Sequence, residues 1–140
     1  MAYLHGREPP LMHHDLKSAN VLIFSEIGTL SGPAQLNCND LMLIRAKLCD
    51  FGLATGLNPN FSALQSIQRT GQNLGGTLAY MAPEVFDDEY TAASECYSYG
   101  IVMWEILTGN VPWLANARTG VPYTHAGLMR AVCNGERPPL

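Results

Sequence analysis

Charged side chains are scarce in this sequence. They make up 14% of its 140 residues, against about 25% in ordinary soluble domains, whereas apolar residues reach 47%. A chain of this length forms one domain and can bury about two-thirds of its surface. So few charged side chains cannot cover a whole protein surface, and we therefore interpret the chain as the inner part of a larger structure.

The sequence also lacks a basic excess, a long apolar run and a secretory leader. The net charge of −4 gives no basic stripe, so we expect no nucleic-acid partner. The apolar run at 101–104 ends at Glu105, far short of the roughly 18 residues of a membrane span, so we expect no membrane insertion. No basic start precedes a long apolar stretch, and we expect a cytoplasmic, intracellular protein.

Paired cysteines are missing as well. The four cysteines stand far apart and form no C-x-x-C pair; they are Cys38, Cys49, Cys96 and Cys133. This spacing argues against a zinc site or a disulfide framework. We therefore expect reduced thiols in the core of the protein.

What the sequence does contain is a group of three polar side chains with different chemistries, directly before the apolar run 21–24. Asp15 can accept a proton, Lys17 can neutralise an oxyanion, and Asn20 can offer its amide oxygen to Mg²⁺. Phosphoryl transfer needs these three roles, because its catalysis is mostly positioning and charge neutralisation. The alternative is a polar turn in which Asp15 and Asn20 cap the local backbone.

Two further motifs follow in order, D-F-G at 50–52 and A-P-E at 82–84. Together with H-H-D-L-K-S-A-N at 13–20, they make the chain resemble the protein kinases, whose signatures are H-R-D-L-x-x-x-N, D-F-G and A-P-E. Residues 94–105 and Trp113 are similar to the tyrosine-kinase-like, Raf-like pattern within that family.

The resemblance implies an ATP-dependent serine/threonine kinase that uses ATP and Mg²⁺ and acts on a protein substrate. The Ser/Thr preference comes from residues 76–84, which resemble the substrate shelf of such kinases. The implied roles are Asp15 as base, Lys17 as γ-phosphate contact, Thr77 as partner of both, Asn20 and Asp50 as Mg²⁺ ligands, and Leu22 as a nucleotide contact. For Asp50, a helix cap or turn cap is the alternative.

The expected fold is mainly α with a short β-hairpin, corresponding to a partial C-terminal lobe of the α+β kinase fold over residues 1–140. The N-terminal lobe, with its glycine-rich loop and strand lysine, and the last helices are absent from this sequence. Gly6 should end a first helix. Apolar residues at 21–24 and about 41–49 predict the hairpin, with an insert between its strands.

Capping residues and apolar spacing predict two further helices. Thr91 and Gly109 predict a helix over 92–108, apolar on nearly every side and therefore buried. A second helix is expected over about 124–134. The polar stretch 55–77 suits a mobile loop.

Departures from the family pattern lead to further expectations. His14 replaces an arginine that grips a loop phosphate, so activation should not depend on phosphate docking there; Ser62, Ser66 and Thr70 are the hydroxyls concerned. Glu95 replaces an aspartate that anchors the catalytic loop, which questions the rigidity of that loop. The arginine that would pair with Glu84 is absent from the sequence. An inactive, kinase-like binding or scaffold fragment is the alternative function.

Overall fold

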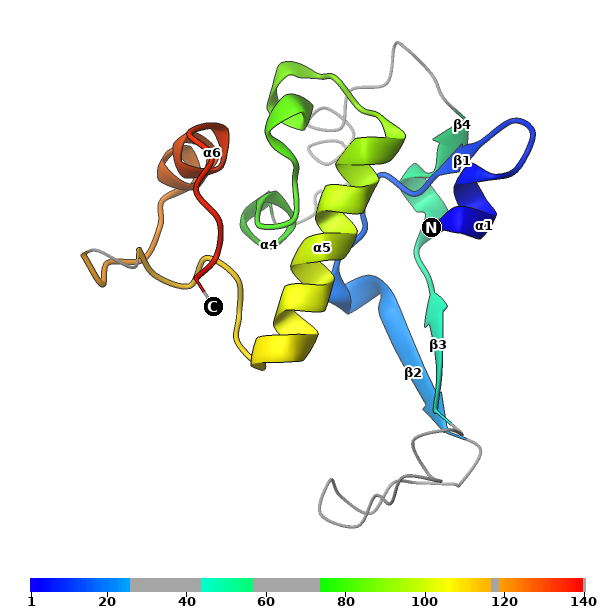
Figure 1. Ribbon diagram of the computed structural model, residues 1–140, viewed down its shortest axis with the longest axis horizontal. Helices are drawn as coiled ribbons and strands as arrows, with labels where there is room; N and C mark the ends of the chain where they lie inside the picture. The colour runs from blue at the N-terminus through cyan, green and yellow to red at the C-terminus, as the bar shows by residue number, and fades with distance from the viewer. Residues whose placement is uncertain (26–43, 57–73, 117–118, 140) are drawn as a thin grey trace.

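The computed structural model describes residues 1–25, 44–56, 74–116 and 119–139, and predictions for the remaining residues lie outside this part of the chain. Figure 1 shows helix α5 through the middle of the molecule, with α6 on one side of it and α1, β1 and β4 on the other. The helices are α1 (Ala2–His5), α4 (Leu74–Leu78), α5 (Ala92–Thr108) and α6 (His125–Cys133), with short 3-10 helices η1 (Ser18–Asn20), η3 (Phe51–Leu53) and η4 (Pro83–Asp87). The strands are β1 (Leu11–Met12), β2 (Val21–Ser25), β3 (Ile44–Leu48) and β4 (Thr55–Gly56).

Helix α5 has the limits that its capping residues predict. The Thr91 side chain accepts a hydrogen bond from the backbone N–H of Ser94, and the Ser94 side chain accepts one from Thr91. Gly109 ends the helix with a φ of 66°, a left-handed conformation that glycine adopts without strain. No helix among the described residues is long and apolar enough to cross a membrane.

The expectation that α5 is buried on nearly every side is wrong, since exposed residues occur along its whole length, among them Cys96 and Tyr99 in its first half. Ile101 and Val102 lie in the core, but Ile106 and Leu107 expose 68% and 77% of their surface. The physical reason is that the described residues pack against only part of this helix, so its remaining apolar side chains face outward.

The core lies where segment 78–85 packs between α5 and α6. Trp113 is buried there; its indole N–H donates to the Ala79 carbonyl at 3.2 Å, and its ring meets the Tyr123 ring edge-on. Helix α6 contributes three apolar residues to this cluster: Leu128, Ala131 and Val132. The Thr124 side chain caps the N-terminus of this helix. The core therefore holds segment 78–85 against both α5 and α6.

The predicted hairpin is present. Strand β2 pairs antiparallel with β3, with Val21 opposite Leu48, and the pair extends away from the helices in Figure 1. The backbone N–H of Cys49 donates to the Asn20 carbonyl at 2.9 Å. The hairpin thereby returns the chain to the loop that precedes β2.

The polar stretch 55–77 is more ordered at its ends than expected. Strand β4 pairs with β1, with Thr55 opposite Met12, and residues 74–78 form α4. Backbone pairing with a distant strand produces β4, and no local pattern in the sequence reveals it. Residues 57–73 of this stretch, including Ser62, Ser66 and Thr70, lie outside the described residues.

The expectation of core thiols is wrong for two of the cysteines. Cys96 and Cys133 are exposed, and Cys49 is half-buried; all three are free thiols. Both exposed cysteines lie on helices, α5 and α6, at positions that point away from the core. Cys38 lies outside the described residues.

Candidate active site

The loop between β1 and β2 holds its acidic group inside the protein. Asp15 is only 3% exposed. The Asn20 side chain, at the end of η1, donates from Nδ2 to the Asp15 carbonyl at 2.8 Å and to Asp15 Oδ2 at 3.1 Å. Asn20 thus binds the local backbone, as in a simple polar turn, but uses only its amide nitrogen to do so. Its amide oxygen takes no part in these contacts.

Lys17 joins two of the sequence-predicted catalytic residues. Its Nζ lies 2.7 Å from Asp15 Oδ2 and donates to Thr77 Oγ1 at 3.1 Å. Thr77 comes from α4, 60 residues farther along the chain. The structure therefore brings Asp15, Lys17 and Thr77 together at one point.

The second carboxylate oxygen of Asp15 has a different environment. Oδ1 is buried and has no hydrogen-bond partner among the described residues. An unpartnered buried acceptor is costly to keep. The two oxygens of Asp15 therefore differ: Oδ2 contacts Lys17, and Oδ1 contacts no polar group among the described residues.

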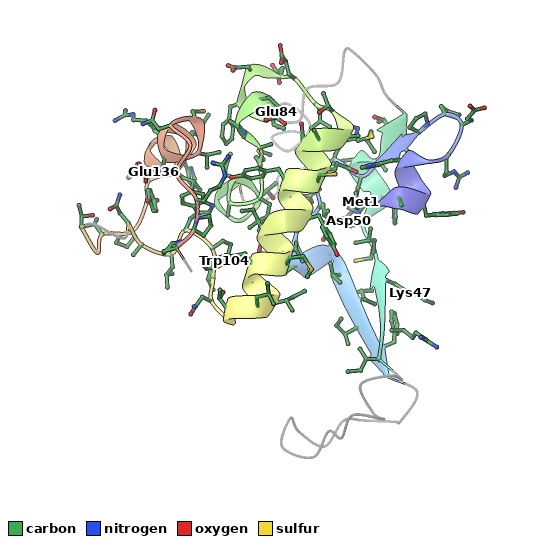
Figure 2. The ribbon with its side chains drawn as sticks, viewed as in Figure 1. Met1, Lys47, Asp50, Glu84, Trp104 and Glu136 are labelled. Carbon is green, nitrogen blue, oxygen red and sulfur yellow. The ribbon has the colours of Figure 1, made fainter. Side chains whose placement is uncertain are left out.

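Asp50 follows β3 and lies close to this loop, at the end of the strand nearer the helices (Figure 2). His13 Nε2 lies 2.9 Å from the Cys49 carbonyl, and the rings of His13 and Phe51 pack at 4.8 Å. Phe51 therefore packs against His13 of the loop that carries Asp15. Asp50 stands at the N-cap of η3 but makes no capping hydrogen bond, so the alternative of a structural cap is not supported.

The oxygen atoms of Asn20 and Asp50 suit a hard cation. Asp50 is exposed, and its φ of 59° turns the chain sharply between β3 and η3. Amide and carboxylate oxygens are the ligands that Mg²⁺ prefers in proteins. The donor set on these two neighbouring segments therefore fits magnesium.

Leu22 lies apart from the polar groups. It is 45% exposed on β2, and strand alternation places it on the opposite face from Val21. Val21 lines an apolar pocket of about 280 Å³ together with Leu16 and Leu48, and Leu22 is not part of its lining. The structure therefore leaves Leu22 on an open apolar surface.

Glu95 anchors the loop from α5. It is fully buried and accepts hydrogen bonds from the backbone N–H groups of His13 and His14, the latter at 2.7 Å. His5 Nε2 also lies 2.7 Å from Glu95 Oε2. The longer side chain therefore still reaches the backbone of the loop. His5, on α1, is a contact that the sequence did not reveal.

The His14 ring is buried and neutral at pH 7. Its Nε2 lies 2.7 Å from Thr55 Oγ1, and its ring packs on Tyr90 at 4.2 Å. Burial lowers the pKa of His14 to about 4, against the opposing effect of the Glu95 charge, while His13 lowers it further. Sequence reasoning missed Thr55 and Tyr90, because neither belongs to a motif.

Tyr80 connects the loop to the middle of the protein. Its hydroxyl donates to Glu105 Oε2 at 2.9 Å and lies 3.0 Å from Ser18 Oγ. Burial raises the pKa of Tyr80 to about 12, and the Glu105 contact adds to this effect while the Ser18 contact opposes it. The phenol therefore stays protonated and bridges η1 to α5.

Glu84 finds a partner within the chain. Ser94 Oγ, at the start of α5, donates to Glu84 Oε1 at 2.7 Å. The Glu84 carboxylate therefore has a hydrogen-bond partner among the described residues. Figure 2 labels Glu84 beside the first turns of α5.

Comparison with known proteins agrees with these motifs. A family model described as "Protein kinase domain" matches residues 1–133. The chain is 33% identical over its whole length to a putative mitogen-activated protein kinase kinase kinase 7-like protein of Drosophila melanogaster, 38% to receptor-interacting serine/threonine-protein kinase 3 of Rattus norvegicus, and 34% to mitogen-activated protein kinase kinase kinase 7 of Mus musculus. It spans 28%, 24% and 19% of their respective lengths.

Proposed function

This chain belongs to the protein kinase family. From that premise we propose that it is part of an ATP-dependent kinase of the tyrosine-kinase-like, Raf-like type that acts on Ser and Thr of proteins, and that it carries the phosphoryl-transfer residues. The observation that carries the proposal is the Asp15 carboxylate, with Oδ2 on Lys17 and a buried Oδ1 without a partner among the described residues.

Each of the site residues has one role in the proposed phosphoryl transfer. The hydroxyl oxygen of the substrate bonds to the γ-phosphorus of ATP as the bond between that phosphorus and the β,γ-bridging oxygen breaks, and the hydroxyl proton passes to Asp15 Oδ1. Lys17 neutralises charge on the γ-phosphate. Magnesium, when held by Asn20 and Asp50, would neutralise charge on the phosphate oxygens.

We also propose that residues 1–140 form part of the C-terminal lobe of the kinase domain. Support comes from the order in which the chain presents its parts: the loop 13–20, the D-F-G at 50–52, the segment ending at Glu84, and then α5. Segment 76–84, held against α5 and α6 by the core, would form the shelf for the protein substrate.

A non-catalytic, kinase-like binding module is the second candidate. It is favoured by the large apolar side chains that remain exposed on β2 and α5, including Ile23, Phe24, Ile106 and Leu107. Exposed apolar surface of this kind marks a site for another protein surface. Transfer of phosphate distinguishes the two candidates.

The test is a transfer assay with γ-labelled ATP, Mg²⁺ and a protein substrate, on this chain and on the complete product of its gene. Asp15→Asn should lower kcat at least about a hundredfold and leave nucleotide binding unchanged. Asp87→Asn, an exposed acid on η4, is the matched control and should behave as wild type. Label should appear on Ser and Thr.

Two results would overturn the proposal. Equal transfer by wild type and Asp15→Asn would remove the role assigned to Asp15. Nucleotide binding without any transfer, in the chain and in the complete gene product alike, would support the binding module instead.

A further inference from the structure

His14 is held from three sides. Its backbone N–H donates to Glu95 Oε1, its ring nitrogen Nε2 shares a hydrogen bond with Thr55 Oγ1, and its ring packs on Tyr90. Its φ of 66° lies in the left-handed region, which a residue with a Cβ adopts only under constraint. The surroundings therefore impose the conformation of the residue directly before Asp15.

The contact with Thr55 crosses between the two acidic segments of the site. Thr55 begins β4, and only η3 and Ala54 separate it from Asp50. The contact joins residues 41 positions apart, beside the pairing of Met12 with Thr55. This hydrogen bond therefore links the loop that carries Asp15 to the segment after Asp50, while His13 and Asn20 contact Cys49 on the segment before it.

We propose that the hydrogen bond between His14 and Thr55 positions Asp15 relative to Asp50 for phosphoryl transfer. This inference rests on the proposed function and names His14 and Thr55 as positioning residues, since neither is assigned a contact with a reacting atom. They act through the backbone of the loop and of β4.

The chemistry of the cluster suits a contact between uncharged groups. Burial keeps the His14 ring neutral at pH 7 and raises the pKa of Tyr90 above its usual value, with Glu95 adding to that rise. A neutral imidazole offers one N–H and one lone pair, so Nε2 and the Thr55 hydroxyl can pair in either direction. The hydroxyl is needed at position 55, and the methyl group is not.

A purely structural role and a positioning role of the hydrogen bond between His14 and Thr55 predict different results when the bond is removed. If the hydrogen bond only added stability, its loss would lower the folded fraction and leave the turnover of each folded molecule unchanged. If it positions Asp15, turnover falls in fully folded protein, because small misplacements of a reacting group are costly. Valine and serine at position 55 separate these cases.

The first measurement is steady-state kinetics. Thr55→Val should lower kcat about tenfold with the KM for ATP within about twofold of wild type, and Thr55→Ser should restore most of the loss. Thr119→Val, which removes an exposed hydroxyl far along the chain, is the matched control. A wild-type kcat in Thr55→Val, or an equal loss in Thr55→Ser, would overturn the proposal.

The second measurement does not depend on activity. Hydrogen exchange at the amides of His14 and Asp15 should rise about fivefold in Thr55→Val, while exchange along α5 stays unchanged and Thr55→Ser matches wild type. If the chain transfers no phosphate, the proposed function fails on its own, and unchanged exchange separately refutes the contact. Faster exchange with an unchanged kcat also rejects the positioning role.

Discussion

Lys17 Nζ lies 2.7 Å from Asp15 Oδ2 and bridges it to Thr77 on a separate helix. Asp15 and Lys17 are both nearly enclosed by protein, so their attraction is weakened by water less than that of a surface pair. The lysine thus fixes one carboxylate oxygen, while the other has no partner among the described residues.

Lys17→Met should therefore reduce catalysis more than binding. We expect kcat to fall about a hundredfold, since both the γ-phosphate contact and the orientation of Asp15 are lost, with a small change in the KM for ATP. Lys47→Met is the matched control, because Lys47 lies exposed on β3 over the Phe24 ring. Figure 2 labels this residue on the hairpin. Equal kcat in the two variants would contradict the role of Lys17.

Asp50→Asn should raise the Mg²⁺ concentration that transfer requires. The substitution removes the negative charge of one proposed ligand while keeping an oxygen, so metal affinity drops without loss of shape. When activity is measured against Mg²⁺ concentration at fixed ATP, the Mg²⁺ concentration that gives half-maximal activity should rise about tenfold or more. The Asp87→Asn variant should follow the wild-type curve, and an unshifted curve for Asp50→Asn would argue that Asp50 is not a ligand.

Glu95→Gln should destabilise the fold strongly. A neutral amide replaces a buried carboxylate that binds two backbone N–H groups and His5. Breaking such a buried charged contact costs about 3 kcal/mol or more, which denaturant unfolding would measure. Glu89→Gln, at an exposed position, should change the free energy of unfolding by less than about 0.5 kcal/mol. A small effect at Glu95 would show that the loop is anchored elsewhere.

The stability of the protein should fall in mild acid because of His14. The folded protein keeps this ring neutral down to about pH 4, whereas in the unfolded chain it takes up a proton near pH 6.5. Between these values the unfolded state binds more protons, so the free energy of unfolding decreases as pH falls from about 6.5 to about 4. The charged and titratable neighbours are Glu95, His13 and Tyr90.

Urea unfolding at pH 7 and pH 5 tests this contribution. The difference between the two pH values should be smaller in His14→Gln, which cannot titrate but can still bond to Thr55. Carboxylates elsewhere titrate in both proteins and cancel in the comparison. An identical pH difference in both proteins would contradict the low pKa.

Alanine at Ser62, Ser66 and Thr70 together should leave kinase activity largely intact. The reason lies in the residue before Asp15: a neutral His14 cannot hold a phosphate with two parallel hydrogen bonds as arginine does. These hydroxyls lie outside the described residues, so the prediction comes from sequence and from His14. A loss above about tenfold, measured in the complete gene product, would contradict it.

The parts of the fold that local sequence encodes could be predicted well. The limits of α5 follow from Thr91 and Gly109, and the hairpin follows from two apolar runs. The grouping of Asp15, Lys17 and Thr77 came from motif resemblance. The contacts of His14 with Thr55 and of Glu95 with His5 join residues 41 and 90 positions apart. Threonine and histidine are common in many settings, so only tertiary packing reveals these pairs.

Strand β2 has one neighbour among the described residues, β3, so its other side presents backbone N–H and C=O groups without a ladder. Its sequence, Val-Leu-Ile-Phe-Ser, carries no charge, and such a strand edge is a template on which further chains can assemble. Arg45 and Lys47 charge only the companion strand. The first aggregates of this protein should therefore grow from β2, which makes it the segment that a molecular chaperone would most need to cover.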